Sequence, residues 1–217
     1  MKNSIKKVLL GMLLATAAIS AHATSTTASW TNWSGTSGSF VQNSNTINVT
    51  YTGQSSWVDH SAYIYDVPSS FTAPSVTNTP GTNGTVVMVG GGNSWGNFHF
   101  SQPVTNPVLD LFSVGQTGVP VRFVFNTTAF SILSQGTGHW AGGSLTQTGN
   151  TVLGREGNGL LQFVGSYTDI SFSLPDYEYY YGATVGAPTE TPIPAAMWLF
   201  GSGLAGLIAA KRKKNTV

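Results

Sequence analysis

The sequence predicts an all-β domain between residues 24 and 185, with the jelly-roll-like architecture of a two-sheet β-sandwich. Short segments in this range alternate polar and apolar residues, which is typical of strands buried on one face. Clusters of the turn-forming residues Gly, Asn and Pro separate these segments. No apolar pattern with the helical period persists here. We therefore expect about ten to twelve short strands, roughly 8–15 residues apart, as in two-sheet sandwiches.

The clearest strands follow in chain order. Residues 46–52 alternate strictly between polar and apolar side chains, and residues 97–101 do the same. Residues 119–125 alternate at first and become apolar at successive positions toward their end, which predicts burial of both faces. Residues 159–164 and 168–174 continue the strand pattern. The turn signals between strands lie at residues 80–84, 90–93, 115–118, 136–138 and 157–159.

Charge is unevenly distributed along the chain. Seven of the nine Lys and Arg residues lie in the two terminal segments, so residues 24–194 keep only Arg122 and Arg155 beside all eight acidic residues, a net charge of −6. Nucleic acid is therefore excluded as a partner, because phosphate binding needs clustered Lys or Arg. The absence of cysteine excludes disulfides and thiolate-bound metal sites. No cofactor is predicted, and a structural calcium ion held by backbone carbonyl oxygens is left open.

The N-terminal segment has the three parts of a secretory signal peptide. Basic residues come first, and residues 8–19 form an apolar stretch that is too short to span a bilayer. Ala21 and Ala23 then form the small-x-small pattern that signal peptidase cleaves. We expect residues 1–23 to be removed, so that the mature chain begins at Thr24. The alternative is an N-terminal anchor helix, which the short apolar stretch disfavours.

The C-terminal segment follows a short linker at residues 186–191 and also has three parts in a fixed order. Pro192, Ile193 and Pro194 keep the approach extended, and Pro194 suits the first turn of a helix. Residues 195–210 carry no charge, and as a transmembrane helix they would span about 24 Å of a roughly 30 Å hydrocarbon core. The basic cluster that follows is retained in the cytoplasm by the positive-inside rule. It consists of Lys211, Arg212, Lys213 and Lys214.

The sequence from Pro192 to Lys214, with its Ala-Ala-Met-Trp198-Leu-Phe-Gly-Ser-Gly-Leu core, resembles the C-terminal signal of PEP-CTERM sorting proteins. That family belongs to Gram-negative bacteria that also make exopolysaccharide. The resemblance implies that exosortase recognises residues 192–217 and cleaves near the proline motif. The sequence departs from the family pattern at one point, because Ile193 stands between the prolines where the name-giving motif has Glu, and Glu190 lies earlier in the chain.

Two carboxylates near the end of the domain are the best candidates for catalysis. Asp176 and Glu178 are two residues apart, so on a strand they would share a face with Tyr180. Glycoside hydrolases use two facing carboxyl groups, one as general acid and the other as base or nucleophile. The alternative is a solvated strand face with the neighbouring tyrosines packed inward, and we favour this interpretation. Glu156 lies in a glycine-rich turn, where it would bind calcium or a sugar hydroxyl, or pair with Arg155. We assign no catalytic residue and no metal site.

Several aromatic side chains lie in polar, glycine-rich surroundings. Trp95 and Trp140 are flanked by Gly, Ser, Asn and His, and Tyr180 belongs to a tyrosine-rich segment. If exposed, such rings would stack on sugar rings, and these three residues are the candidate glycan contacts. The alternative is ordinary packing in the core or at a sheet edge, where aromatic side chains bury large areas.

These features together predict an exported protein that signal peptidase and exosortase process. Its inner-membrane-anchored precursor would give rise to a form at the cell surface or in the extracellular matrix. We expect a non-enzymatic structural or adhesive role in exopolysaccharide or biofilm. The first alternative is a carbohydrate-binding, lectin-like module. The second is a glycoside hydrolase that uses Asp176 and Glu178.

Overall fold

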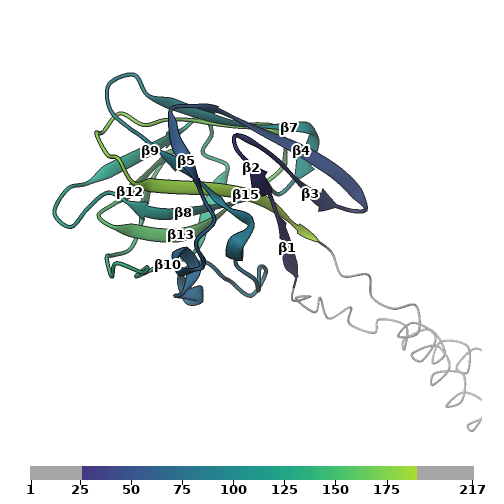
Figure 1. Ribbon diagram of the computed structural model, residues 1–217, viewed down its shortest axis with the longest axis horizontal. Coiled ribbons are helices and arrows are strands. Elements are labelled where there is room, and N and C mark those ends of the chain that lie inside the picture. The colour runs from purple at the N-terminus through teal and green to yellow at the C-terminus, as the bar shows by residue number, and fades with distance from the viewer. Residues whose placement is uncertain (1–25, 190–217) are drawn as a thin grey trace, which may run out of the picture.

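Two antiparallel β-sheets face each other in the computed structural model, which describes residues 26–189 (Figure 1). The all-β prediction and the two-sheet sandwich are confirmed. The predicted signal peptide and sorting signal lie outside the described residues. Within residues 26–189, no helix has the length and apolar character needed to cross a membrane.

The first sheet, called sheet A, has seven strands. Their order is β10 (Phe130–Gly136), β13 (Gly157–Phe163), β8 (Val108–Val114), β15 (Tyr181–Thr189), β6 (Thr85–Met88) and β5 (Ser55–Asp59), and β1 (Thr27–Trp30) pairs with the end of β15.

The second sheet, called sheet B, has eight strands. Their order is β11 (Thr146–Thr148), β12 (Thr151–Gly154), β9 (Val121–Phe125), β14 (Ser166–Ser173), β7 (Trp95–Thr105), β4 (Asn45–Gly53), β3 (Ser37–Gln42) and β2 (Asn32–Ser34). The described residues thus form more strands than the sequence predicted, because the shortest ones are too brief to show an alternating pattern.

The core fills the space between the sheets. In sheet B, Val49 and Tyr51 of β4 lie opposite Phe100 and Phe98 of β7, and all four side chains are buried. Leu109 of β8 reaches the same cluster from sheet A. The predicted alternation of residues 46–52 and 97–101 therefore marks the faces that pack inward, and each residue between them points to the outside.

The linker prediction is wrong at its start. Strand β15 continues through residues 186–189, where it pairs with β1 from Gly186↔Trp30 to Thr189↔Thr27. The Ala-Pro-Thr composition suggested a linker, but Pro188 is tolerated because β1 is the only neighbour of β15 at this end. The domain therefore extends at least to Thr189, and residues 190–191 lie outside the described part.

The outer face of sheet A is covered by residues 60–84. This segment contains the short 3-10 helices η1 (Ala62–Tyr65), η2 (Pro68–Ser70) and η3 (Gly81–Asn83). Tyr65 and Phe71 from the segment pack on Phe112, an outward-facing residue of β8. The cover therefore extends the hydrophobic packing beyond the sandwich and places Tyr63 of η1 beside sheet A.

The most deeply buried carboxylate of the described residues lies beneath this cover. Asp110 of β8 is on the same outward-facing row as Phe112, and its side chain is buried. Neither of its carboxylate oxygens has a hydrogen-bond partner among the described residues. Burial raises the pKa of the Asp110 carboxyl well above its usual range. The folded state therefore favours the neutral, protonated form of this side chain.

Candidate functional site

A pocket of about 370 Å³ lies at one end of sheet A. Antiparallel pairing creates it, because β8 ends where both of its neighbours begin: Val114 pairs with Gly157 of β13, and Phe112 pairs with Gly182 of β15. The residues just outside these three strand ends therefore converge. The pocket is lined by Tyr63, Ser113, Gln116, Trp140, Glu156, Glu178 and Tyr180.

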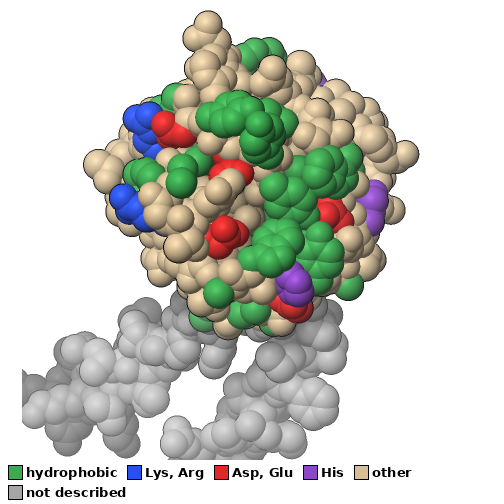
Figure 2. Space-filling model, turned by 60° about the vertical axis from the view of Figure 1, so that its left-hand side comes forward, with side chains coloured by type: hydrophobic (Ala, Val, Ile, Leu, Met, Phe, Trp, Pro, Cys, Tyr) green, Lys and Arg blue, Asp and Glu red, His purple; other side chains and the backbone are tan. Residues whose placement is uncertain are grey.

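Aromatic rings form one wall of the pocket. The ring centroid of Trp140 lies 5.0 Å from that of Tyr180, 5.7 Å from that of Tyr63 and 5.3 Å from that of the buried Phe112. Trp57 of β5 extends the wall, with its ring centroid 5.5 Å from that of Tyr180. Trp140 is 45% exposed and Trp57 is 49% exposed. Figure 2 shows hydrophobic side chains gathered around acidic ones on this face.

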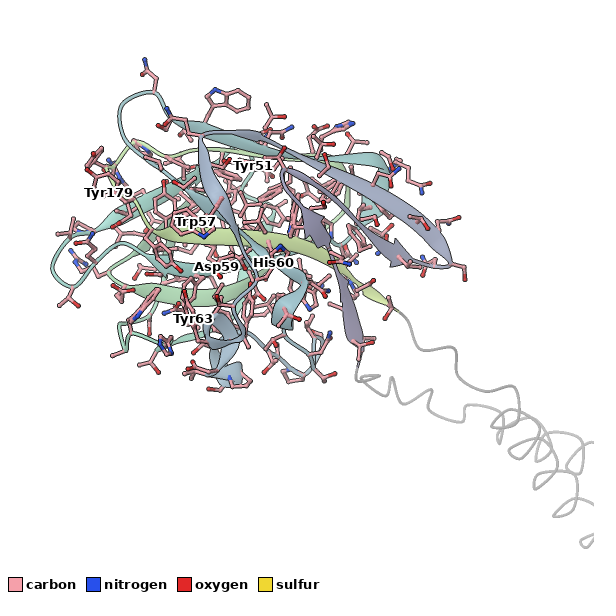
Figure 3. All side chains as sticks on the ribbon, viewed as in Figure 1. Tyr51, Trp57, Asp59, His60, Tyr63 and Tyr179 are labelled. Carbon is pink, nitrogen blue, oxygen red and sulfur yellow. The ribbon has the colours of Figure 1, made fainter. Side chains whose placement is uncertain are left out.

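Asp59 fixes the position of two of these rings. The hydroxyls of Tyr63 and Tyr180 both donate to its Oδ2, at 3.0 and 2.8 Å, and the backbone N–H of Ser61 donates to its Oδ1 at 2.8 Å. Partial burial opposes the charged form, but the hydrogen bonds outweigh it and lower the pKa of the Asp59 carboxyl. Trp57, Asp59 and Tyr63 are labelled in Figure 3, near one another on the same side of the sandwich. The Asp59 carboxylate therefore fixes the positions of Tyr63 and Tyr180 in the aromatic wall.

Glu156 forms part of the opposite wall on an unusual backbone. Both Glu156 and Ser113 have positive φ angles, of 64° and 54°, which residues other than glycine rarely adopt. Asn158 holds both: its Oδ1 accepts from the Ser113 N–H at 2.9 Å, and its Nδ2 donates to the Glu156 carbonyl at 3.1 Å. The Ser113 hydroxyl then donates to Glu156 Oε1. Backbone strain of this kind concentrates at functional sites.

Glu178 is the most buried acidic residue of the pocket, at 2% exposure. Its Oε1 accepts three hydrogen bonds, from Gln116 Nε2 at 3.1 Å and from the backbone N–H groups of Tyr179 and Tyr180 at 2.9 and 3.3 Å. Its Oε2 has no partner among the described residues. Burial raises the pKa of the Glu156 carboxyl, the hydrogen bond from Ser113 lowers it, and the charge of Glu178 in the same pocket raises it further.

The structure separates the predicted pair Asp176 and Glu178. Both lie in the irregular segment before β15, so the expectation of a strand there is wrong. Asp176 is held by Arg122, whose Nε and Nη2 donate to it at 2.8 and 2.7 Å, and these bonds lower the pKa of the Asp176 carboxyl. Asp176 does not line the pocket. The partner of Glu178 in the pocket is Glu156, which the sequence placed in a separate turn.

Trp95 lies apart from the other candidate glycan contacts. It is 50% exposed at the start of β7, in sheet B, on the face opposite the core residue Phe98. Two hollows adjoin it, lined by uncharged residues such as Asn93 and Asn126. Of the three candidates, the structure therefore brings Trp140 and Tyr180 together and leaves Trp95 on the other sheet.

Sequence reasoning missed Trp57 and Tyr63 as members of the aromatic wall. A usable signal was present, because Trp57 and Asp59 are two residues apart on a strand and must share a face. Nothing local indicated that Tyr63 and Tyr180, distant in the chain, would donate to that same carboxylate. Their meeting depends on the cover of residues 60–84 folding over sheet A.

The pocket combines flat apolar surfaces with hydrogen-bonding groups, as ligand sites usually do. Its acidic wall has no basic residue among the lining side chains. Among residues 26–189, no three His, Cys, Asp or Glu side chains gather as a metal site would require. The arrangement suits a ligand that has an apolar face, hydroxyl or amine donors, and no negative charge.

No family model, no curated protein and no solved structure matches this chain. The fold and the pocket define it as a two-sheet β-sandwich with a pocket that is lined by aromatic and acidic side chains.

Proposed function

We propose that this chain is an exported adhesive protein of the cell surface or extracellular matrix, whose jelly-roll-type sandwich binds glycan through the pocket. One observation carries the proposal. Four aromatic side chains, those of Trp57, Tyr63, Trp140 and Tyr180, adjoin one another at the mouth of a hollow that is otherwise lined by hydrogen-bonding groups.

Sugars are amphipathic in a way that matches these two walls. The C–H face of a pyranose ring is apolar and stacks on an aromatic ring, whereas its hydroxyls need hydrogen-bond partners at the edge. Trp140 and Trp57 offer partly exposed rings, and the carboxylates of Glu156 and Glu178 accept hydrogen bonds. The excess of carboxylates disfavours uronic acids and sulfated sugars, so the expected ligands are neutral or amine-bearing glycans.

The role is one of binding and not of hydrolysis. Asp176 is engaged by Arg122, which removes one member of the carboxylate pair that the sequence offered for hydrolysis. The carboxylate that remains beside Glu178 belongs to Glu156, which already accepts the Ser113 hydroxyl.

A glycan panel tests this proposal. We expect the purified protein to be retarded in affinity electrophoresis by neutral or amine-bearing polysaccharides and to migrate freely in gels that contain alginate or another polyuronate. Uniform migration in all gels would contradict glycan binding. Release of reducing ends from a retarding polysaccharide would contradict a non-enzymatic role.

Export and sorting form the second part of the proposal. Support comes from the order of the Pro192-Ile193-Pro194 motif, the apolar residues 195–210 and the basic cluster that begins at Lys211. Residues 1–23 act as the signal peptide, and exosortase acts on residues 192–217. Because β1 pairs with the last residues of β15, the described part of the chain begins and ends side by side (Figure 1).

An epitope fused after Val217 tests the sorting step in an exosortase-producing host. We expect the surface form to lack the epitope and the membrane precursor to retain it, as judged by immunoblotting of fractions. The precursor should accumulate when exosortase is deleted. A surface form that still carries the epitope would contradict removal of the tail.

A further inference from the structure

The pocket contains an acceptor that the protein itself leaves unused. Glu178 Oε2 is buried without a hydrogen-bond partner, while Oε1 of the same carboxylate takes three N–H donors. A buried polar atom without a partner is costly, and a buried charge more so. This atom belongs to a side chain that lines the pocket, so a ligand entering there is the natural source of the missing donor.

The neighbouring carboxylate adds to the demand for positive charge. The charge of Glu178 contributes to the raised pKa of the Glu156 carboxyl. No Lys or Arg lines the pocket. Of the two arginines in the described residues, Arg122 is bound to Asp176, and Arg155 neither lines the pocket nor forms an ion pair with a described carboxylate. The repulsion between Glu156 and Glu178 is therefore not compensated by a basic side chain of the pocket.

The opposite wall suits a particular kind of cation. The rings of Tyr63, Trp140 and Tyr180 are tilted relative to one another, with interplanar angles of 58° between Tyr63 and Trp140 and 71° between Trp140 and Tyr180. Aromatic faces attract ammonium groups through the ring quadrupole, and cages of this type hold organic cations. Calcium would instead require six to eight oxygen ligands, which the aromatic wall does not supply.

We propose that the pocket recognises the free ammonium group of a 2-amino sugar, so that it selects de-N-acetylated glycans over their acetylated and neutral counterparts. This inference rests on the proposed glycan binding and specifies its ligand class. The ammonium donates to Glu178 Oε2 and approaches Glu156, while the sugar ring and the ammonium contact the aromatic wall. N-acetylation removes the positive charge and adds a bulky group. The carboxylates and the aromatic faces then no longer attract the nitrogen as a cation.

Titration calorimetry of the full chain tests the selectivity with three oligosaccharides of equal length. These are β-1,4-linked glucosamine, its fully N-acetylated form and the corresponding neutral glucan. We expect glucosamine to bind at least about tenfold more tightly than the other two. Equal affinity for all three would overturn the inference and leave glycan binding intact. Failure of all three to bind would overturn both.

Two substitutions connect the preference to the pocket. Glu178→Gln keeps an oxygen that can accept from Gln116 and the two backbone N–H groups, and Glu156→Gln keeps an acceptor for Ser113. Each is expected to abolish the preference for glucosamine while binding of the neutral glucan persists. Asp169→Asn is the matched control, because this exposed carboxylate lies on β14 of sheet B and bonds to His99 and Asn97. A preference that survives both Gln variants, or that vanishes when divalent cations are chelated, would overturn the inference.

Discussion

Replacing Trp140 with alanine is expected to weaken glycan binding by about 10- to 100-fold. Covering a large, exposed apolar side chain contributes about 1.5–3 kcal/mol, and each 1.4 kcal/mol corresponds to a factor of ten in affinity. Trp140 stands at the centre of the wall, in contact with Tyr63, Phe112 and Tyr180, so its loss also removes support from the other rings. Affinity is measured by titration calorimetry with the tightest-binding glycan from the panel.

Trp95→Ala is the matched control for this variant. Trp95 is exposed to a similar degree but lies on sheet B, away from the pocket. We expect its replacement to leave the affinity for the same glycan unchanged. Equal losses in both variants would show that binding does not depend on the pocket. Circular dichroism of each variant separates a loss of contact from a loss of fold.

Asp110→Asn is expected to remove a large pH dependence from the stability of the domain. Because burial raises the pKa of Asp110 in the folded state, the folded protein binds a proton that the unfolded chain releases above its ordinary pKa of 3.8. The stability that this proton provides is complete below the unfolded pKa and is lost as the pH rises toward the folded pKa. Within that interval the free energy of unfolding falls by about 1.4 kcal/mol per pH unit.

The measurement compares urea unfolding of the two proteins from pH 4 upward, and the difference between the curves isolates Asp110. The ionisable group next to it is the buried Tyr65, whose pKa is raised by burial and by Asp110, so it stays neutral throughout. Asp169→Asn provides the control. Desolvation opposes the charged form of Asp169, but hydrogen bonds from Asn97 and His99 outweigh it and lower the pKa of this carboxyl. Its contribution to stability therefore changes only below its ordinary pKa of 3.8, and from pH 4 upward its curve should run parallel to that of the wild type. Parallel curves for the wild type and Asp110→Asn would contradict a neutral, buried Asp110.

The alternating segments were sufficient to predict the class of fold. Residues 46–52 and 97–101 became the paired strands β4 and β7, because a period of two leaves a strand only one way to bury its apolar face. Two segments were predicted wrongly, one from its composition and one from its spacing. Residues 186–189 have the composition of a linker, and pairing with β1 makes them a strand. Residues 174–180 have the spacing of a strand, and they form the irregular wall that carries Glu178.

Composition limits the residue types that this domain can use at a binding site. With two arginines and no lysine in residues 24–194, any site had to rely mainly on carboxylates, hydroxyls, amides, imidazoles and aromatic rings. The sequence also supplied Trp140 and Tyr180 as candidates. The meeting of these rings with Tyr63 and Trp57 could be seen only in the folded domain, as could the presence of Glu178 in one pocket with Glu156 instead of Asp176. Antiparallel pairing brings loops that are distant in the chain to the same end of the sheet, so strand order, and not spacing along the chain, sets which side chains share the pocket.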